Sequence, residues 1–449
     1  MCKRGSVIEA NVVDTIFPNK GLVYVDGKKI IVHGAIEGQK LRIQIVKKRR
    51  DRIEAKILEV LERSPLEQEP ACRQFGLCGG CTYLHIPYES QLEIKASQVL
   101  KLLQDAAIKG FDFLGIEPSP KESAYRNKME YTFGHGGDGL LELGLHRKRM
   151  RYEISPVTGC QLVDEDFLCI LDSVLGYFRE VGIPFYHKKS HQGVLRNLVI
   201  RKAGTTNEIL VNLITTSQQE LTLTDLSERL QQLHLTGHLK GFLHTINDGK
   251  ADTIQADSIR VIWGDDHITE RILGLTFQIS AFSFFQTNSY GAEKLFSLVR
   301  DFASPRPDVV FDLYCGTGTI AQIISPLADQ VIGIEIVPEA IEAAQENARI
   351  NNLDNCRFIA GDVLTELDAL HHQPDLIILD PPRGGIHPKA LDKVISIDAP
   401  YLIYVSCQPV SLAKDLKVLA ASGYTATRVK CVDMFPHTPH IETVVQLQL

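Results

Sequence analysis

The sequence lacks the features that mark exported, membrane-spanning and repetitive proteins. No apolar run approaches the roughly 20 residues that a membrane-spanning helix needs, and no signal-peptide core follows the segment Met1–Ser6. Neither an internal repeat nor a low-complexity segment is present. Positive charge is not in excess, because 48 Lys and Arg against 55 Asp and Glu leave a net charge of −7. We therefore expect a cytoplasmic globular protein without a membrane partner, whose affinity for any nucleic acid comes from local patches.

The length and the cysteine content set further limits. A chain of 449 residues is too long for one hydrophobic core, so it predicts two or three domains. Ten cysteines without a secretion signal favour reduced thiols, metal ligands or catalysis over disulfides. No segment points to an obligate protein partner.

Residues 1–62 predict a small β domain. Short apolar runs alternate with glycines there, a pattern typical of a small barrel. The basic segment Lys47–Arg52 lies between the last two predicted strands and is either a solvated loop or an RNA-contacting one. The region resembles a TRAM domain, which is an RNA-binding barrel. The segment Ser64–Pro70 is predicted to be a linker.

Three cysteines follow the linker with the spacing C-x5-C-x2-C, at Cys72, Cys78 and Cys81. Three thiols within ten residues can hold one metal centre if a fourth ligand comes from elsewhere. Cys160 is the best candidate because it follows a glycine in a predicted loop, whereas Cys169 falls in an apolar, helical stretch. Ligation by thiolates alone suits zinc or a [4Fe–4S] cluster, and the spacing leaves both open.

The remainder of the chain divides into a strand-rich part and an α/β part. Strand patterns dominate from Tyr125 to Gly264, where clustered basic residues form either a solvated edge or an RNA-facing wall. Strands and helices then alternate over residues 270–449, which predicts a mostly parallel sheet covered on both faces. The basic residues are Arg126, Lys128, Arg147, Lys148, Arg149 and Arg151.

Three successive strand ends in the α/β part carry groups suited to a nucleoside. The strand 309–313 is followed by a turn in which Gly316 and Gly318 let the backbone approach a ligand closely. Glu335 ends the next strand, where a carboxylate can accept hydrogen bonds from ribose hydroxyls. Asp362 follows the third strand and can reach an adenine. Together these residues resemble the S-adenosylmethionine site of class I methyltransferases.

The next strand ends carry reactive groups. Asp380 begins a Pro-Pro motif that many amino-group methyltransferases continue with an aromatic residue, but Arg383 stands there and counts against amine methylation. Cys407 ends the fifth strand, where ligands bind in such sheets, and is either a nucleophile or a small buried residue. Glu442 leads into the last strand and has a better claim to chemistry than the two histidines of the same loop.

A thiol, a carboxylate and a methyl donor in one site predict methylation at carbon 5 of uracil. That carbon is a poor nucleophile, but a thiolate that adds to C6 turns the ring into an enolate that is nucleophilic at C5. After methyl transfer, a base must remove the C5 proton so that the thiolate can leave. Cys407 and Glu442 fit these two roles. The target nucleotide must be unstacked or flipped out of any helix.

Nearly the whole chain resembles the RNA (uracil-5-)-methyltransferase family, in the TRAM-containing branch that carries an iron–sulfur cluster. The matching segments are the four cysteines Cys72, Cys78, Cys81 and Cys160, together with Ser283–Asn288, Asp312–Gly316, Asp380–Arg383, Ser406–Pro409 and His437–Glu442. The resemblance makes Cys407 the nucleophile and Glu442 the base, and it favours a [4Fe–4S] cluster over zinc. The residues that it assigns to S-adenosylmethionine or to the uracil pocket are Gln286, Tyr314, Glu335 and Asp380.

The resemblance also implies a domain division and a substrate. It implies an RNA-binding barrel at 1–62, a central iron–sulfur and RNA-binding domain at 63–88 and 122–265, and a methyltransferase domain at 89–121 and 266–449. The helix near residues 89–107 would then pack against the catalytic domain. A uridine in 23S ribosomal RNA is the expected target. Transfer RNA is the alternative substrate, and a non-catalytic RNA-binding assembly factor is the alternative class of protein.

Overall fold

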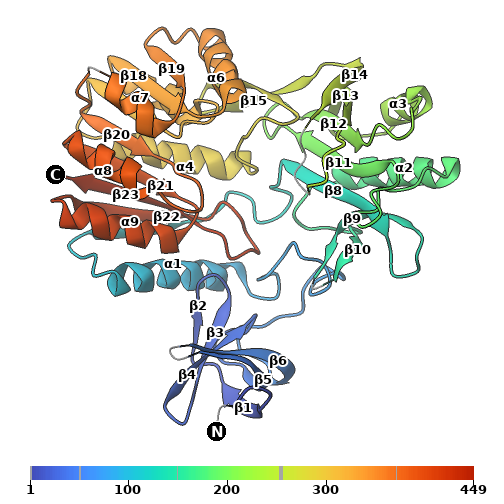
Figure 1. Cartoon of the computed structure of the whole chain (residues 1–449), viewed down its shortest axis with the longest axis horizontal. Coiled ribbons are helices and arrows are strands. Elements are labelled where there is room, and N and C mark those ends of the chain that lie inside the picture. The colour runs from blue at the N-terminus through green and yellow to red at the C-terminus, as the bar shows by residue number, and fades with distance from the viewer. Residues whose placement is uncertain (1–2, 50–51, 149, 252–255, 371) are drawn as a thin grey trace.

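Three large β-sheets follow one another along the chain in the computed structural model (Figure 1). The structure describes residues 3–49, 52–148, 150–251, 256–370 and 372–449. Within these ranges no helix is both long enough and apolar enough to cross a membrane.

The N-terminal part is a six-stranded sheet in the order β1-β5-β6-β4-β3-β2. Alternate residues of β5, such as Leu41 and Ile43, are fully buried and meet Val23 and Ile30 in a core of their own. The prediction of an N-terminal β domain is therefore confirmed. Its strands are β1 (Val7–Asn11), β2 (Asp14–Ile16), β3 (Lys20–Val25), β4 (Lys28–His33), β5 (Lys40–Arg49) and β6 (Arg52–Glu62).

The central part is a seven-stranded sheet in the order β10-β9-β8-β11-β12-β13-β14, packed against α2 and α3 (Figure 1). Helix α2 begins where the Asp164 side chain accepts a hydrogen bond from the backbone N–H of Asp166, and it ends at Gly182 in the left-handed conformation. Its elements are β8 (Lys128–His135), β9 (Leu141–Arg147), β10 (Met150–Pro156), α2 (Glu165–Val181), β11 (Leu195–Lys202), β12 (Glu208–Thr215), α3 (Thr224–Gln231), β13 (His238–Ile246) and β14 (Ser258–Gly264). A hairpin of β15 (His267–Ile272) and β16 (Leu275–Ser280) follows.

The C-terminal part contains the predicted α/β sheet, with the strand order β19-β18-β17-β20-β21-β23-β22-β7. The five strands from β19 to β21 are parallel to their neighbours, and β23 runs antiparallel between β21 and β22. The strands are β7 (Asp112–Glu117), β17 (Val309–Leu313), β18 (Gln330–Glu335), β19 (Cys356–Ala360), β20 (Leu376–Leu379), β21 (Tyr401–Ser406), β22 (Thr425–Val432) and β23 (Glu442–Gln448).

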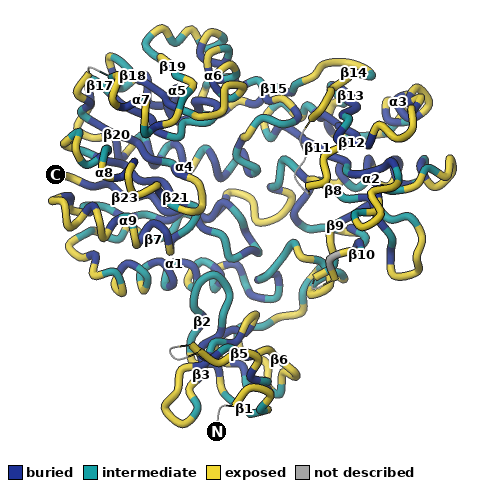
Figure 2. Tube along the Cα trace, viewed as in Figure 1, coloured by how far each residue is buried: buried dark blue, intermediate teal, exposed yellow. Residues whose placement is uncertain are grey.

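Helices cover both faces of this sheet, so its central strands β17, β20, β21 and β23 are mostly buried, whereas the edge strands β7 and β19 are partly exposed (Figure 2). Helices α4 (Ser289–Phe302), α5 (Thr319–Ile324) and α6 (Pro338–Ile350) share a hydrophobic core with one face. The other face packs against α1 (Tyr88–Asp105), α7 (Val363–Ala369), α8 (Pro388–Ser396) and α9 (Pro409–Ala421). A short 3-10 helix at Ser325–Leu327 follows α5.

Strand β7 is an element that the sequence pattern did not predict. It comes from the segment between α1 and the central sheet, yet it pairs in parallel with β22 at the edge of the C-terminal sheet. The strand is short, and Gly115 interrupts its apolar pattern. Because the partner strand β22 lies far away in the sequence, no local sequence pattern predicts that the two strands pair.

Helix α1 lies between the N-terminal sheet and the C-terminal sheet (Figure 1). Val99 and Leu103 on one side of the helix belong to the core of the C-terminal sheet. On another side, Gln98 donates a hydrogen bond to the carbonyl oxygen of Thr15 over 3.0 Å, and Lys101 pairs with Asp14. One helix therefore contacts both parts of the chain.

Candidate active site

Cys407 lies directly after β21, at the carboxyl end of the sheet. The Ser406 hydroxyl accepts a hydrogen bond from the backbone N–H of Gln408 over 3.1 Å, which closes a tight turn around the cysteine. Pro409 then occupies the first turn of α9, where its missing N–H leaves no hydrogen bond unmade. The thiol is thereby held on a rigid strand–turn–helix unit.

The antiparallel strand β23 brings Glu442 next to Cys407. Ser406 pairs with Thr443 in the register between β21 and β23, and Cys407 and Glu442 are the next residues outward on the two strands. Residues directly opposite each other on antiparallel strands point to the same face. The two side chains that the sequence assigns to catalysis are therefore neighbours.

Cys407 and Glu442 lie close enough to Asp380 and Arg383 for the charges of these two residues to shift their pKa values. Burial raises the pKa of the Cys407 thiol to about 11, the charges of Glu442 and Asp380 add to the rise, and Arg383 opposes it. Burial also raises the pKa of Glu442 well above its usual range, and Asp380 adds to this while Arg383 opposes it. The Glu442 side chain is only 4% exposed.

The glycine turn after β17 forms the adjoining part of the site. Tyr314, Gly316 and Gly318 all have positive φ angles, of 65°, 54° and 70°. A Cβ atom on Gly318 would lie 2.5 Å from the Phe358 ring, whereas a Cβ on Gly316 would point into open space. Gly318 is therefore required for packing against β19, and Gly316 leaves a free surface for a ligand.

The carboxylates predicted for nucleoside binding lie around this turn. Glu335 accepts hydrogen bonds from the N–H groups of Gly316 (3.2 Å) and Val337 (3.1 Å). Asp362 caps α7 by accepting from Leu364 N–H. Burial raises the pKa of Tyr314 to about 12, and the nearby Asp362 charge contributes to the rise. The structure thus brings Tyr314, Gly316, Glu335 and Asp362 together.

Asp312 is a further residue of the site to which the sequence analysis gave no role. Its side chain is fully buried inside β17, and Oδ2 accepts a hydrogen bond from the N–H of Ala321 over 2.9 Å. Burial raises the pKa of Asp312 to about 8, and Asp380 contributes to the rise. Burial alone raises the pKa of Asp380 to about 7. The sequence signal that could have identified Asp312 is a carboxylate within an otherwise apolar strand.

Gln286 lies in a loop that the central sheet holds against the glycine turn. The side-chain amide of Asn127 donates to the carbonyl oxygen of Gln286 over 3.0 Å, and Thr317 Oγ1 donates to that of Phe284 over 3.4 Å. Arg201, whose side chain is almost fully buried, donates to the carbonyl oxygens of Ala281 and Ser283. Central residues therefore fix this part of the site.

The four cysteines Cys72, Cys78, Cys81 and Cys160 line one pocket, together with apolar residues that include Phe75 and Leu162. Tight turns gather the first three, because Cys78 N–H donates to the Gln74 carbonyl and Gly80 N–H donates to the Cys78 sulfur. In the described part of the chain, however, no three His, Cys, Asp or Glu side chains are grouped so that they could hold a metal ion. The structure therefore shows the convergence of the cysteines but no metal centre.

A family model described as tRNA (Uracil-5-)-methyltransferase matches residues 87–449, which contain Asp380, Cys407 and Glu442. The chain belongs to this family. It is therefore a member of the RNA uracil-5-methyltransferase family. The predictions of the family and of an enzyme are confirmed.

Relatives and a solved structure cover essentially the full chain. An uncharacterized RNA methyltransferase of Clostridium tetani is 51% identical over 450 residues, spanning 99% of this chain and 98% of that protein. An uncharacterized RNA methyltransferase of Clostridium acetobutylicum is 50% identical, and the match spans 100% of this chain and 99% of that protein. The crystal structure of Pyrococcus abyssi tRNA (uracil-54, C5)-methyltransferase in complex with S-adenosyl-L-homocysteine is similar with a TM-score of 0.77 and 26% identity, covering 98% of this chain and 100% of that chain.

Proposed function

We propose that the protein methylates carbon 5 of a uridine in 23S ribosomal RNA, with Cys407 as the nucleophile and Glu442 as the base. The observation that carries the proposal is the position of Cys407 and Glu442, which extend the register of β21 and β23 by one residue. The pair lies beside Asp380 at the carboxyl ends of the parallel strands, where α/β sheets bind their ligands.

The first half of the reaction needs the thiolate of Cys407. Its sulfur attacks C6 of the uracil, the C5–C6 double bond becomes part of an enolate, and C5 becomes the nucleophile. Arg383 assists because its positive charge lowers the pKa of the thiol against the effect of burial. We assign Asp380 to the uracil ring, which its carboxyl group can hydrogen-bond in either protonation state because burial raises its pKa to about 7.

The second half needs a base at C5. Glu442 takes the C5 proton, the electron pair of that C–H bond restores the C5–C6 double bond, and the C6–S bond breaks to release Cys407. A carboxylate whose pKa is raised by burial is a stronger base than an exposed one. One site thus supplies both covalent and general-base catalysis.

The residues around the glycine turn fit S-adenosylmethionine, which when bound supplies an electrophilic methyl group. Gly316 leaves open space at the turn, and Glu335 and Asp362 offer carboxylates to ribose and adenine on neighbouring strands. Tyr314 lies near Asp362, and Gln286 belongs to the loop whose Phe284 carbonyl accepts a hydrogen bond from Thr317 of the glycine turn. We propose these residues, together with Asp380, as the lining of the methyl-donor and uracil sites.

Ribosomal RNA fragments containing 5-fluorouridine test the reaction and the substrate together. Fluorine at C5 does not leave as a proton, so elimination stalls and the RNA stays attached to the protein. With S-adenosylmethionine present, we expect a covalent adduct that mass spectrometry maps to Cys407 in a fragment of 23S RNA. Cys169→Ala, which changes an exposed cysteine of α2, is the matched control and should form the same adduct.

Transfer RNA is the second candidate substrate, because the similar Pyrococcus abyssi enzyme is named for uracil 54 of transfer RNA. If an adduct forms with transfer RNA that contains 5-fluorouridine and with no ribosomal fragment, the substrate is transfer RNA. The proposed roles of Cys407 and Glu442 would not change. Absence of an adduct with whole-cell RNA would contradict the mechanism itself.

We propose that Cys72, Cys78, Cys81 and Cys160 hold a [4Fe–4S] cluster. All four line one pocket with apolar walls, which suits a cluster bound by thiolates alone. Methyl transfer needs no electrons, so we assign the cluster a structural or RNA-positioning role.

Iron analysis tests the cluster directly. Protein purified without oxygen should be brown and contain about four irons per chain if these cysteines bind one cluster. Cys81→Ser and Cys160→Ser should each lose most of the iron, whereas Cys169→Ser should keep it because its side chain is exposed on α2. Stoichiometric zinc without iron would refute the cluster and leave the proposal for Cys407 untouched.

We further propose that the N-terminal sheet is a TRAM domain, and that it binds RNA together with the central sheet. Lys47, Lys48 and Arg49 are exposed at the end of β5, while Arg50 and Asp51 of the same predicted loop lie outside the described residues. On the central sheet Arg147 pairs with Glu153 over 2.9 Å. Arg149, which belongs to the same cluster of basic residues in the sequence, lies outside the described residues. The domain limits 1–62, 63–88 with 122–265, and 89–121 with 266–449 are part of this proposal.

A further inference from the structure

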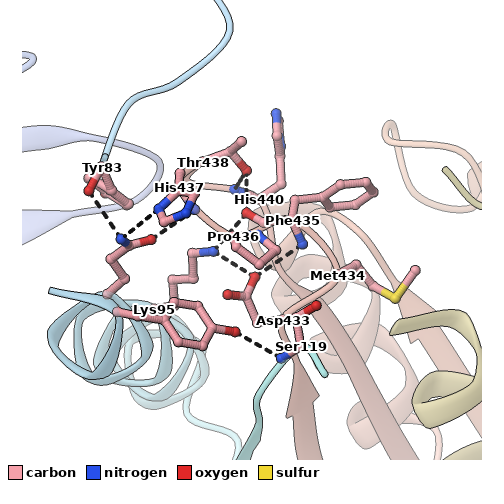
Figure 3. Close-up of polar contacts among 12 residues, drawn as sticks. Tyr83, Lys95, Ser119, Asp433, Met434, Phe435, Pro436, His437, Thr438 and His440 are labelled. Carbon is pink, nitrogen blue, oxygen red and sulfur yellow. Dashed lines mark hydrogen bonds and ion pairs between the residues drawn. The ribbon is translucent and has the colours of Figure 1, made fainter. Parts of the chain in front are cut away.

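A fully buried ion pair joins α1 to the segment that precedes the proposed base. The Lys95 ammonium lies 2.7 Å from Asp433 Oδ1, and both side chains have no exposed surface (Figure 3). Replacing such a pair by apolar residues of similar size is often neutral or stabilising, because removing two charges from water is costly. Stability alone therefore does not account for the pair.

The pair fixes the backbone of residues 433–441, which we call the base loop because it leads directly into Glu442. Asp433 Oδ1 also accepts a hydrogen bond from the N–H of Phe435 over 3.1 Å. Lys95 Nζ donates to the carbonyl oxygen of the same residue, also over 3.1 Å (Figure 3). Both backbone groups of Phe435 are thus held by the ion pair, which an apolar pair does not do.

Gln91, one turn earlier on α1, provides a second attachment. Its Oε1 accepts a hydrogen bond from the N–H of His437 over 2.8 Å, and its Nε2 donates to the carbonyl oxygens of Tyr83 and Ile86. His437 has a φ of 66°, a left-handed conformation that is costly for a residue with a side chain. The attachment holds the base loop in that conformation.

Four consecutive carbonyl oxygens of the base loop accept hydrogen bonds from other segments. Asn288 donates to Met434 over 2.9 Å, and Lys95 donates to Phe435. The remaining bonds run from Tyr125 OH to Pro436 (3.0 Å), and from the N–H groups of Thr82 and Tyr83 to His437 (2.8 and 2.9 Å). Thr82 directly follows Cys81, so the cysteine loop, α1 and the central segment all meet on the base loop.

We propose that Lys95 is a positioning residue that sets the base loop so that the Glu442 carboxylate reaches the C5 proton. The inference rests on the proposed function, because it assigns Lys95 to the elimination half of the reaction. Catalytic groups must be held within fractions of an ångström, and a misplacement of about 1 Å costs about 100-fold in rate. Cys407 comes from β21 and its own turn, so addition to C6 does not depend on this loop.

The test separates elimination from addition. Lys95→Met/Asp433→Leu removes both charges together, so neither remains buried without a partner. We expect this variant to form the 5-fluorouridine adduct at within about twofold of the wild-type rate, while 5-methyluridine formation on natural RNA falls roughly 10- to 100-fold. Denaturing gels should then show methylated RNA still attached to the protein. A merely loosened fold would slow both steps equally.

Further variants keep the result decisive. Gln91→Leu removes the second attachment without removing a charge. It should likewise slow elimination and leave addition to C6 unchanged. This variant tests the proposal if the double variant does not fold. Lys101→Met is the matched control on α1, since Lys101 pairs with Asp14 of the N-terminal sheet, and it should alter neither step. Equal losses in both steps, or no loss, in the folded variants would overturn the role of Lys95.

Glu442→Gln distinguishes this inference from the proposed function. If Glu442→Gln accumulates the adduct on natural RNA and the Lys95 and Gln91 variants do not, only the positioning role is wrong. If Glu442→Gln accumulates none, the assignment of the base fails, and the role of Lys95 fails with it.

Discussion

Replacing Cys407 with alanine should lower 5-methyluridine formation by on the order of 10⁴-fold or more. Without a thiolate at C6 no enolate forms, and C5 remains too poor a nucleophile to take a methyl group. The fold should survive, because the pKa of about 11 means that the thiol is neutral at pH 7 and alanine removes no charge. Transfer of labelled methyl groups from S-adenosylmethionine to RNA is the measurement.

Two controls give this result its meaning. Cys169→Ala should keep full activity, because that cysteine is exposed on α2. Cys407→Ala should still bind S-adenosylmethionine with nearly the wild-type affinity, since the proposed donor site lies around Gly316 and Glu335. Normal methyl transfer by a correctly folded Cys407→Ala protein would exclude covalent catalysis through this residue.

The parts of the site that were predictable from the sequence are those that local patterns determine. The strands β17, β18, β20 and β21 are each predicted by an apolar run in the sequence. The residue at the carboxyl end of the strand can then be read directly, as for Glu335, Asp380 and Cys407. Because the carboxyl ends of parallel strands meet at one edge, these residues could be placed together without coordinates.

The remaining parts depend on pairings between distant segments. No local pattern shows that β23 inserts antiparallel beside β21, although that insertion places Glu442 opposite Cys407. Strand β7 was missed for the same reason. The only sequence signal for Lys95 is its place beside the apolar positions of an amphipathic helix. Its partner Asp433 lies 338 positions away in the sequence. Such a residue is recognisable as buried only when the partner is known.

Glu442→Gln should convert the enzyme from a catalyst into a covalent trap. The Glu442 side chain is buried, and burial raises its pKa well above the usual range, so an uncharged amide of the same shape should replace the carboxyl group with little effect on folding. Addition and methyl transfer then proceed, but the C5 proton stays, and turnover should fall by about 10²- to 10⁴-fold. Natural RNA should accumulate on the protein as a methylated adduct visible on denaturing gels.

The pH dependence of the same species supplies an independent check on Glu442. A base with a raised pKa is active only when ionised, so the preformed adduct of the wild-type enzyme should decline faster as pH rises when elimination is followed on its own in a single turnover. In Glu442→Gln the adduct should show no such decline, because the amide does not titrate. The double variant Cys407→Ala/Glu442→Gln should form no adduct at any pH, since the bond to RNA is made by that sulfur. A Glu442→Gln enzyme that turns over normally would show that another group is the base, and Asp380, which lies near Cys407 and has a raised pKa, would be the first candidate.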